Sequence, residues 1–558
     1  MTRSLLVLGS LLLSPPSGSA PPDDVPAGRA LYRDETLTSG APLRGVLQGD
    51  VEVRGAAASC SRCHRPSGFG SSEGAAIVPP VTGPSLFSPR QARSADLIRG
   101  LYQDPLPDVA RAAARTPRDR PAYDERSLAA ALRTGIDPAG RTLDPLMPRY
   151  DLSDEDLKAL TAYLQTLASV PDPGVDERSL HLATVISSGV DPARRRALLS
   201  VIEAFVRARN LDVRRERDRP GFSPHFKGEY RDALREWVLH VWELDGPAGT
   251  WGAQLDAHQR RRPVFALVSG LVEGGWRPVH EFSARSGVPC LFPATDLPGG
   301  SDDADSPTIY LSRGLAGEAE ALGSWLSGPG RVPPAARIVQ IYRPTEQGTT
   351  LAEAFRRGLR GDARAGLVDH RLPADDARAL ESWFRSVADR PPAILVLWLA
   401  SADLDTLPPP ESLSRRVDVY LSGGLLDGEV TSVPRPWIGR VQLTYPFALP
   451  GHEEPQIYRA RAWLRSRKVE RGPERLQLAA FFAMSVVEHS LARMVDHFSR
   501  EYLIECVEHE AENAMNPGLF PQMSLGPGQR FASKGCYIVS PSPTASGEVV
   551  PVSPWIIP

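Results

Sequence analysis

Two cysteines and a histidine in one short segment carry the clearest chemistry in the sequence. The segment is Cys60-Ser61-Arg62-Cys63-His64, and its C-x-x-C-H spacing is that of covalent c-type haem attachment. Two thiols at this spacing add to the two haem vinyl groups as thioethers, and a helical turn then brings the adjacent imidazole under the iron. The segment predicts one covalently bound haem c, attached through Cys60 and Cys63, with His64 as an axial iron ligand.

Two other uses of such cysteines are a redox dithiol and half of a zinc site. A thioredoxin-like dithiol would begin a helix in a βαβ context, which the surrounding sequence does not predict. A structural zinc ion needs four ligands. Between residues 21 and 170, however, His64 is the only histidine and Cys60 and Cys63 are the only cysteines. The pattern therefore favours haem.

The second axial ligand follows by elimination within the same stretch. Met147 is its only methionine and Lys158 its only lysine. Met147 is the better candidate, because prolines flank it in Leu143-Asp144-Pro145-Leu146-Met147-Pro148 and a rigid loop can hold a thioether against a haem face. The alternative is a methionine that fills a gap in the core.

The elements around these residues are predicted to be short helices separated by loops, with no strand between residues 27 and 168. Helices are expected over residues 28–33, 92–102 and 125–135. A final helix begins after Ser153, which can cap it, and carries one apolar stripe of Leu157, Leu160, Tyr163, Leu164 and Leu167.

Over residues 25–170 the sequence resembles the class I c-type cytochromes. The resemblance is carried by Gly28, Tyr32, the haem motif, Gly83-Pro84-Ser85-Leu86 and the Met147-Pro148 loop. It implies an all-α domain in which the carbonyl of Pro84 accepts the N–H of the His64 imidazole, although Pro79 or Pro80 could take that role. An iron held by histidine and methionine favours one-electron transfer over catalysis, so we expect an electron-transfer protein; a haem peroxidase is the minor alternative.

The remainder of the chain has a different pattern. After a short linker expected over residues 171–177, short apolar runs alternate with helical segments, beginning with His181–Ile186 and a helix over residues 192–209 and continuing to Val417–Leu421. Strands that alternate with helices in this way form mostly parallel sheets. This region of roughly 380 residues is too large for one sheet, so we expect a two-lobed α/β domain over residues 178–550.

Polar residues end two successive strands of this domain. Ser269 follows Val264–Val268, and Thr295 follows Val288–Phe292. With Val441–Tyr445 and residues 524–530, these segments resemble the type I periplasmic binding proteins of the branched-chain amino-acid and amide group. The resemblance implies a small polar organic ligand whose carboxylate is held by Ser269, Ala294 and Thr295 from the first lobe; Gln347 and Asp427 are candidates from the second. The alternative is that Ser269 and Thr295 only cap helices.

Composition and charge limit the partners and the location. The chain has 558 residues and a net charge of −3, without the basic excess typical of nucleic-acid binding. Residues 1–20 combine Arg3, an apolar run and small residues, which predicts a secretory signal peptide. No later stretch predicts a membrane span, so a periplasmic location is expected. In that compartment Cys506 and Cys536 could form a disulfide.

The sequence therefore predicts an exported monohaem c-type cytochrome fused to a periplasmic-binding-protein-like domain. Its expected activity is one-electron transfer with a redox partner protein, such as a periplasmic dehydrogenase or oxidase. The second domain would bind a small ligand or dock that partner. The alternative is a solute-binding or sensing protein of a transport system in which the haem domain is auxiliary.

Overall fold

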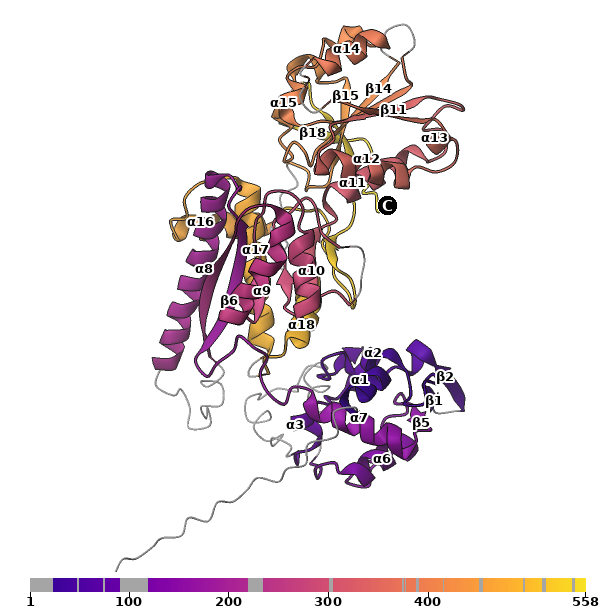
Figure 1. Ribbon diagram of the computed structural model, residues 1–558, viewed down its shortest axis with the longest axis vertical. Coiled ribbons are helices and arrows are strands. Elements are labelled where there is room, and N and C mark those ends of the chain that lie inside the picture. The colour runs from indigo at the N-terminus through magenta and orange to yellow at the C-terminus, as the bar shows by residue number, and fades with distance from the viewer. Residues whose placement is uncertain are drawn as a thin grey trace, which may run out of the picture. The chain divides into compact units, whose positions relative to one another are not determined.

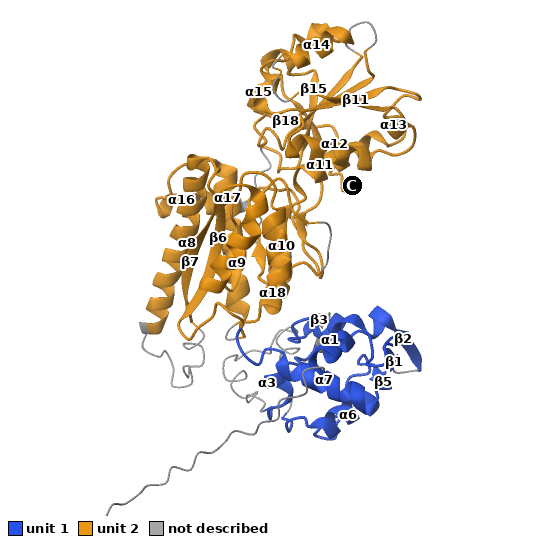
Figure 2. Ribbon diagram, in the orientation of Figure 1, with its two compact units in different colours: residues 1–171 blue, residues 172–558 orange. Residues whose placement is uncertain are grey.

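A computed structural model divides the chain into two units, residues 1–171 and residues 172–558 (Figure 1, Figure 2). It describes residues 24–47, 50–73, 76–90, 119–218, 234–300, 305–373, 376, 378–387, 391–414, 416–450, 455–494, 497–513, 518–543 and 547–558. The expected signal peptide and the expected helix over residues 92–102 lie outside the described residues. Of the helices that are described, none has the length and apolar character that a bilayer crossing requires.

Unit 1 is built on two helices from opposite ends of its sequence. The helix α1 (Asp24–Asp34) packs across α7 (Asp154–Thr166). Gly28 lies at the crossing, where an ideal Cβ would be 2.0 Å from the carbonyl oxygen of Ala159. Only glycine permits this approach. Next to it, the rings of Tyr32 and Tyr163 lie 5.5 Å apart between centroids. The other helices are η1 (Gly55–Ala58), α2 (Cys60–His64), α3 (Gly83–Leu86) and α6 (Glu125–Thr134).

Unit 1 also contains short strands, so the expectation of an all-α domain was wrong. A three-stranded antiparallel sheet has the order β2-β1-β5, and a separate hairpin pairs β3 with β4. The strands are β1 (Arg44–Leu47), β2 (Val51–Arg54), β3 (Ser71–Glu73), β4 (Ala76–Val78) and β5 (Arg149–Tyr150). Each has only two to four residues, too few for the alternating pattern that identifies a strand in a sequence.

The first lobe of unit 2 is a parallel six-stranded sheet in the order β16-β10-β9-β8-β6-β7. Its strands are β6 (Ser179–Ser187), β7 (Glu236–Leu244), β8 (Ala266–Val268), β9 (Cys290–Leu291), β10 (Thr308–Ser312) and β16 (Phe531–Ser533). One face packs on α8 (Pro192–Asp218), α16 (Pro455–Ser466), α17 (Glu474–Met494) and α18 (Arg500–Asn513). The other face packs on α9 (Trp251–Arg261) and α10 (Arg277–Ser286).

The second lobe is a seven-stranded sheet in the order β12-β11-β13-β14-β15-β17-β18. Its strands are β11 (Ile338–Tyr342), β12 (Leu367–Arg371), β13 (Ile394–Trp398), β14 (Asp418–Ser422), β15 (Val441–Tyr445), β17 (Tyr537–Pro541) and β18 (Val549–Pro551). The first five strands of that order are parallel and the last two antiparallel. The helices are α11 (Gly314–Leu326) and α12 (Glu346–Gly358) on one face, α14 (Ala379–Ser386) and α15 (Ser401–Leu404) on the other, and the short α13 (Gly361–Ala365).

The chain passes between the two lobes three times. It leaves the first lobe after β10 to form α11, returns after β15 to form α16, and leaves again between β16 and β17. The expected two-lobed α/β architecture with mostly parallel sheets is therefore present. Segments that connect two lobes in this way can act as hinges.

The segment that follows Pro171 is tied to the first lobe. The Asp172 carboxylate accepts the backbone N–H of Arg500 at 2.7 Å, and the Arg500 side chain donates to the carbonyls of Pro173 at 3.0 Å and Val264 at 2.7 Å. Part of the expected linker is thus structured within unit 2.

Cys506 and Cys536 are both free and buried, so the suggested disulfide between them is not formed. Cys506 belongs to α18, whereas Cys536 lies next to β17. The Cys536 sulfur instead accepts the backbone N–H of Tyr445 at 3.0 Å.

Candidate functional site

The haem motif forms a helix of its own in unit 1. The helix α2 contains all five motif residues, and a single turn separates Cys60 from Cys63. Two buried tyrosines hold its ends: the Tyr150 hydroxyl donates to the carbonyl of Ala58 at 2.9 Å, and the Tyr32 hydroxyl donates to that of Arg65 at 2.8 Å. Both thiols therefore lie on a short helix that is anchored before and after the motif.

The imidazole of His64 is 7% exposed, and its Nδ1 lies 2.9 Å from the carbonyl oxygen of Pro79. A proton on Nδ1 makes this bond and leaves the lone pair of Nε2 for a metal. Burial lowers the pKa of His64, which favours the neutral, ligating form. Such a carbonyl partner fixes the ring and raises its basicity.

The assignment of this role to Pro84 was wrong, because Pro79 supplies the carbonyl. The hairpin β3–β4 returns the chain so that Pro79 lies beside His64. Gly70 makes the return possible: its φ is +81°, and an ideal Cβ there would be 2.1 Å from the carbonyl oxygen of Val78. Pro84 instead belongs to the first turn of α3.

Met147 lies in a loop braced by hydrogen bonds. Its N–H donates to the carbonyl of Asp144 at 3.0 Å, the Asp144 carboxylate accepts the N–H of Leu146 at 2.9 Å, and the Arg149 guanidinium donates to the carbonyl of Met147. The side chain is partly buried and packs on the same core cluster as Cys60.

The residues present fit a haem c. A covalent haem with histidine and methionine axial ligands needs two thiols, an imidazole and a thioether. The domain has two thiols one helical turn apart, a buried imidazole with one nitrogen held by a carbonyl, and a partly buried thioether in a braced loop. Among the residues that the structure describes, no three His, Cys, Asp or Glu side chains are grouped to hold a metal ion. Within the part of the chain that the structure describes, the zinc alternative has no ligand set.

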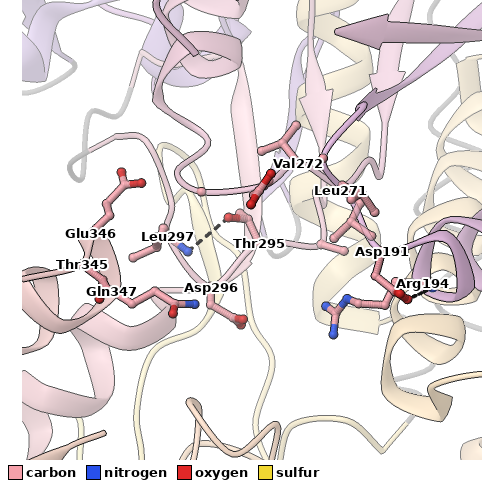
Figure 3. A pocket seen from close by; sticks show the side chains of 15 residues that line it. Asp191, Arg194, Leu271, Val272, Thr295, Asp296, Leu297, Thr345, Glu346 and Gln347 are labelled. Carbon is pink, nitrogen blue, oxygen red and sulfur yellow. Dashed lines mark hydrogen bonds between the residues drawn. The ribbon is translucent and has the colours of Figure 1, made fainter. Parts of the chain in front are cut away.

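A cavity of about 460 Å³ lies in unit 2 at the cleft between the two lobes. Its walls come from the loop before α8, the loops after β8 and β9, and the start of α12 (Figure 3). These loops follow the carboxyl ends of strands, where open α/β sheets bind small ligands.

Three of the predicted ligand-binding residues line this cavity: Ala294, Thr295 and Gln347. Ser269 does not line it. Its side chain is 0% exposed, and its hydroxyl has no hydrogen-bond partner among the described residues. Asp427 is also absent from the lining, and its carboxylate lies 3.9 Å from the Arg194 guanidinium.

The sequence analysis missed five charged residues of the lining: Asp191, Arg194, Glu273, Asp296 and Glu346. Asp296 directly follows the predicted Thr295, and Glu346 directly precedes the predicted Gln347, so both had a signal in the sequence. Glu346 also bridges the lobes, because its carboxylate accepts the backbone N–H of Gly275 at 2.9 Å.

A buried carboxyl, Glu318 of α11, lies at the carboxyl ends of the interior strands β14 and β15 of the second lobe. It is 1% exposed and accepts hydrogen bonds from the hydroxyl of Ser422, the N–H of Gly424 at 3.0 Å and the hydroxyl of Thr444 at 3.1 Å. Burial outweighs these bonds and raises the pKa of Glu318 to about 7.

Replacing Glu318 with glutamine is expected to remove a pH dependence from the stability of unit 2. Because the pKa is raised on folding from 4.5 to about 7, the folded state favours the protonated form. The contribution of this group to stability is complete below pH 4.5 and is lost as the pH rises through about 7. The loss is about 3 kcal/mol. The variant should therefore be more stable than the parent at pH 8 and similar to it at pH 4.5.

Urea unfolding followed by tryptophan fluorescence measures this effect, because all ten tryptophans lie after residue 236 and report on unit 2 alone. Glu381→Gln, at an exposed site on α14, is the control and should keep the parent pH dependence. Equal pH dependence in the parent and Glu318→Gln would contradict the prediction.

Comparisons with known proteins support the assignment of unit 1. Residues 54–168 match the family model of cytochrome c, and no curated protein matches the chain. Solved structures are also similar to it, among them the following three. A branched-chain amino acid ABC transporter protein from Thermus thermophilus with bound valine has 11% identity and a TM-score of 0.48, over 69% of this chain and 98% of that one. A solute binding protein of an ABC transporter from Rhodopseudomonas palustris, in complex with 3,4-dihydroxy benzoic acid, has 12% identity and a TM-score of 0.48, over 68% and 98%. A putative branched-chain amino acid ABC transporter protein from Rhodospirillum rubrum has 16% identity and a TM-score of 0.45, over 67% and 100%.

The family match covers the motif helix, Pro79 and Met147. The prediction of a c-type cytochrome domain, made from the C-x-x-C-H motif and the single methionine, is confirmed by this match. Residues 54–168 of this chain form a cytochrome c domain.

Proposed function

We propose that this protein is an exported monohaem c-type cytochrome that transfers one electron at a time, and that its second unit captures a small organic ligand between its lobes. The observation that carries the first part is the buried His64 imidazole, held at Nδ1 by Pro79 and preceded by two thiols one helical turn apart. The chain has only one C-x-x-C-H motif, so one haem is expected.

Electron transfer is favoured by the proposed ligand set. His64 and Met147 would occupy both axial positions of the iron, which leaves no open position for a substrate. The haem, when bound, supplies reversible one-electron chemistry. The chain supplies the thiols that hold it, a neutral imidazole whose orientation Pro79 sets, and a thioether that favours a higher potential.

Ligand capture is supported by the cleft cavity and by the three chain crossings between the lobes. The same observations favour the second candidate function, a solute-binding or sensing protein with an auxiliary haem. Under either function we place the protein in the periplasm, on the basis of the signal-like residues 1–20.

The electron-transfer function is tested on the protein purified from the periplasm. A pyridine haemochrome assay should give one covalent haem per chain, and a potentiometric titration should follow a one-electron curve. The ferrous protein should bind no carbon monoxide, and peroxide turnover should stay at background. Carbon monoxide binding with peroxide turnover would instead favour the haem enzyme. A thermal-shift screen of amino acids, amides and short-chain alcohols tests ligand capture.

Replacing Met147 with alanine is expected to lower the haem potential by on the order of 100 mV, because a thioether ligand stabilises the reduced iron. The far-red absorption band of sulfur-to-iron ligation should disappear in the same variant. Spectroelectrochemistry measures both effects. Leu146→Ala is the control, since this neighbouring side chain is 67% exposed. If the far-red band survives in Met147→Ala, Met147 is not the ligand.

A further inference from the structure

The cleft cavity of unit 2 has an excess of negative charge. Its lining contains four carboxylates, Asp191, Glu273, Asp296 and Glu346, and Arg194 is the only Lys or Arg among the lining residues that the structure describes. In a cleft with low-dielectric walls such an excess raises the local concentration of cations.

Two of these carboxylates are already engaged by the protein. Asp191 accepts the backbone N–H groups of Ala193 at 3.0 Å and Arg194 at 2.9 Å, and so begins α8. Glu346 accepts the N–H of Gly275 across the cleft. Both have structural roles that account for their position.

The other two, Asp296 and Glu273, are available to a ligand. Among the described residues, no hydrogen bond or ion pair is made to either carboxylate. The Asp296 backbone is fixed, because its carbonyl accepts the N–H of Leu315 at 3.0 Å. The Glu273 carboxylate lies next to Gly189: an ideal Cβ built on Gly189 would be 1.8 Å from the Oε2 atom of Glu273. A larger residue at position 189 would displace this carboxylate.

Asp296 is the stronger of the two candidates. Its side chain is exposed to the cavity and lies between Arg194 and Gln347 in Figure 3. Partial desolvation of this carboxylate by the cleft walls and the nearby carboxylate of Asp427 raise the pKa of Asp296 to about 6, so most of this group is still ionised at pH 7.5. The cation Arg194 cannot neutralise the cleft alone, since it also faces Asp427 at 3.9 Å.

We propose that the cleft binds a small organic cation, an alkylamine whose ammonium group pairs with Asp296. This inference rests on the proposed ligand capture and names its chemical class. An ammonium group has three donors. Three groups can accept these N–H donors: the Asp296 carboxylate, the amide oxygen of Gln347 and the Thr295 hydroxyl. The Thr295 hydroxyl already accepts the N–H of Leu297 at 3.1 Å and keeps one lone pair for the ligand.

The rest of the lining suits the carbon part of such a ligand. Leu271, Val272 and Leu297 supply apolar wall (Figure 3), and a cavity of about 460 Å³ accommodates a short alkyl chain. A divalent metal ion is a poorer fit, because no three acidic or histidine side chains are grouped to hold one among the described residues.

The test uses the full-length haem-loaded protein and four probes that share a four-carbon chain: n-butylamine, 1,4-diaminobutane, n-butanol and butyrate. Isothermal titration calorimetry at pH 7.5 measures binding, and a thermal shift read by tryptophan fluorescence assigns it to unit 2. The amines should bind, whereas butanol and butyrate should not. Asp296→Asn should weaken amine binding about tenfold or more, because it removes the paired charge from the cleft. Asp405→Asn, at an exposed site in the second lobe, should leave it unchanged.

The outcomes separate this inference from the function on which it rests. If butyrate or butanol binds and the amines do not, ligand capture stands and the cationic class is wrong. If amines bind with equal affinity to Asp296→Asn and the parent, the assignment of Asp296 is overturned. If no probe binds and a broader screen of amino acids and amides also fails, ligand capture itself fails and the inference with it.

Discussion

Replacing both Cys60 and Cys63 with serine is expected to abolish covalent haem completely. Each thioether needs its own thiol, and no other cysteine of the chain precedes a histidine in this motif. A pyridine haemochrome assay after acidic acetone extraction measures the effect. The parent protein should retain its haem with the chain, and the double variant should retain none. Each single variant should hold haem through one thioether at reduced yield.

The control for this experiment lies inside the motif. Arg62 occupies one of its two variable positions and is exposed, so Arg62→Ala should load haem as the parent does. Tryptophan fluorescence provides a second check, because unit 2 contains every tryptophan and should unfold as in the parent when haem is lost from unit 1. Covalent haem in the double variant would refute the attachment site.

Replacing Gly28 with alanine is expected to destabilise unit 1 by about 3 kcal/mol or more. The added Cβ would lie 2.0 Å from the carbonyl oxygen of Ala159 and 2.7 Å from Cβ of Tyr163. The first of these neighbours is backbone, so no side-chain rotation relieves the overlap and α1 must move away from α7. The contact between Tyr32 and Tyr163 at this crossing would then be lost as well.

The direction of the change in the stability of unit 1 distinguishes helix propensity from steric overlap at the helix crossing. Within an isolated helix, alanine is more favourable than glycine by about 1 kcal/mol, so helix propensity alone predicts stabilisation. Thermal unfolding followed by haem absorbance measures which effect dominates. Arg29→Ala, at the exposed neighbouring position of the same helix, is the control and should change the midpoint little. An unchanged or raised midpoint in Gly28→Ala would show that the helices do not cross as described.

The long elements of the fold were predictable because their patterns are local. The stripe of apolar residues from Leu157 to Leu167 predicted α7, and the apolar run Val417–Leu421 predicted β14. The short strands of unit 1 were not predicted, since pairs such as Gly45 with Tyr150 join residues far apart in the sequence. The all-α expectation for unit 1 failed for this reason.

The haem motif is the part of the candidate site that the sequence determined by itself. Thioether formation and ligation by the next imidazole require cysteines and a histidine at one contiguous spacing, so residues 60–64 carry the whole signal. The choice of Met147 also came from the sequence, because no other methionine lies within the domain.

Only the tertiary structure decided which groups surround these sites. Pro79 and Pro84 are both near enough in sequence to reach His64, and the path of the β3–β4 hairpin selects Pro79. In unit 2, Asp191, Asp296 and Glu346 come from three distant segments, and they share one cavity because the strands before them end at the cleft. Covalent chemistry depends on local spacing and is readable in a sequence, whereas a binding cleft depends on how distant strand ends meet after folding.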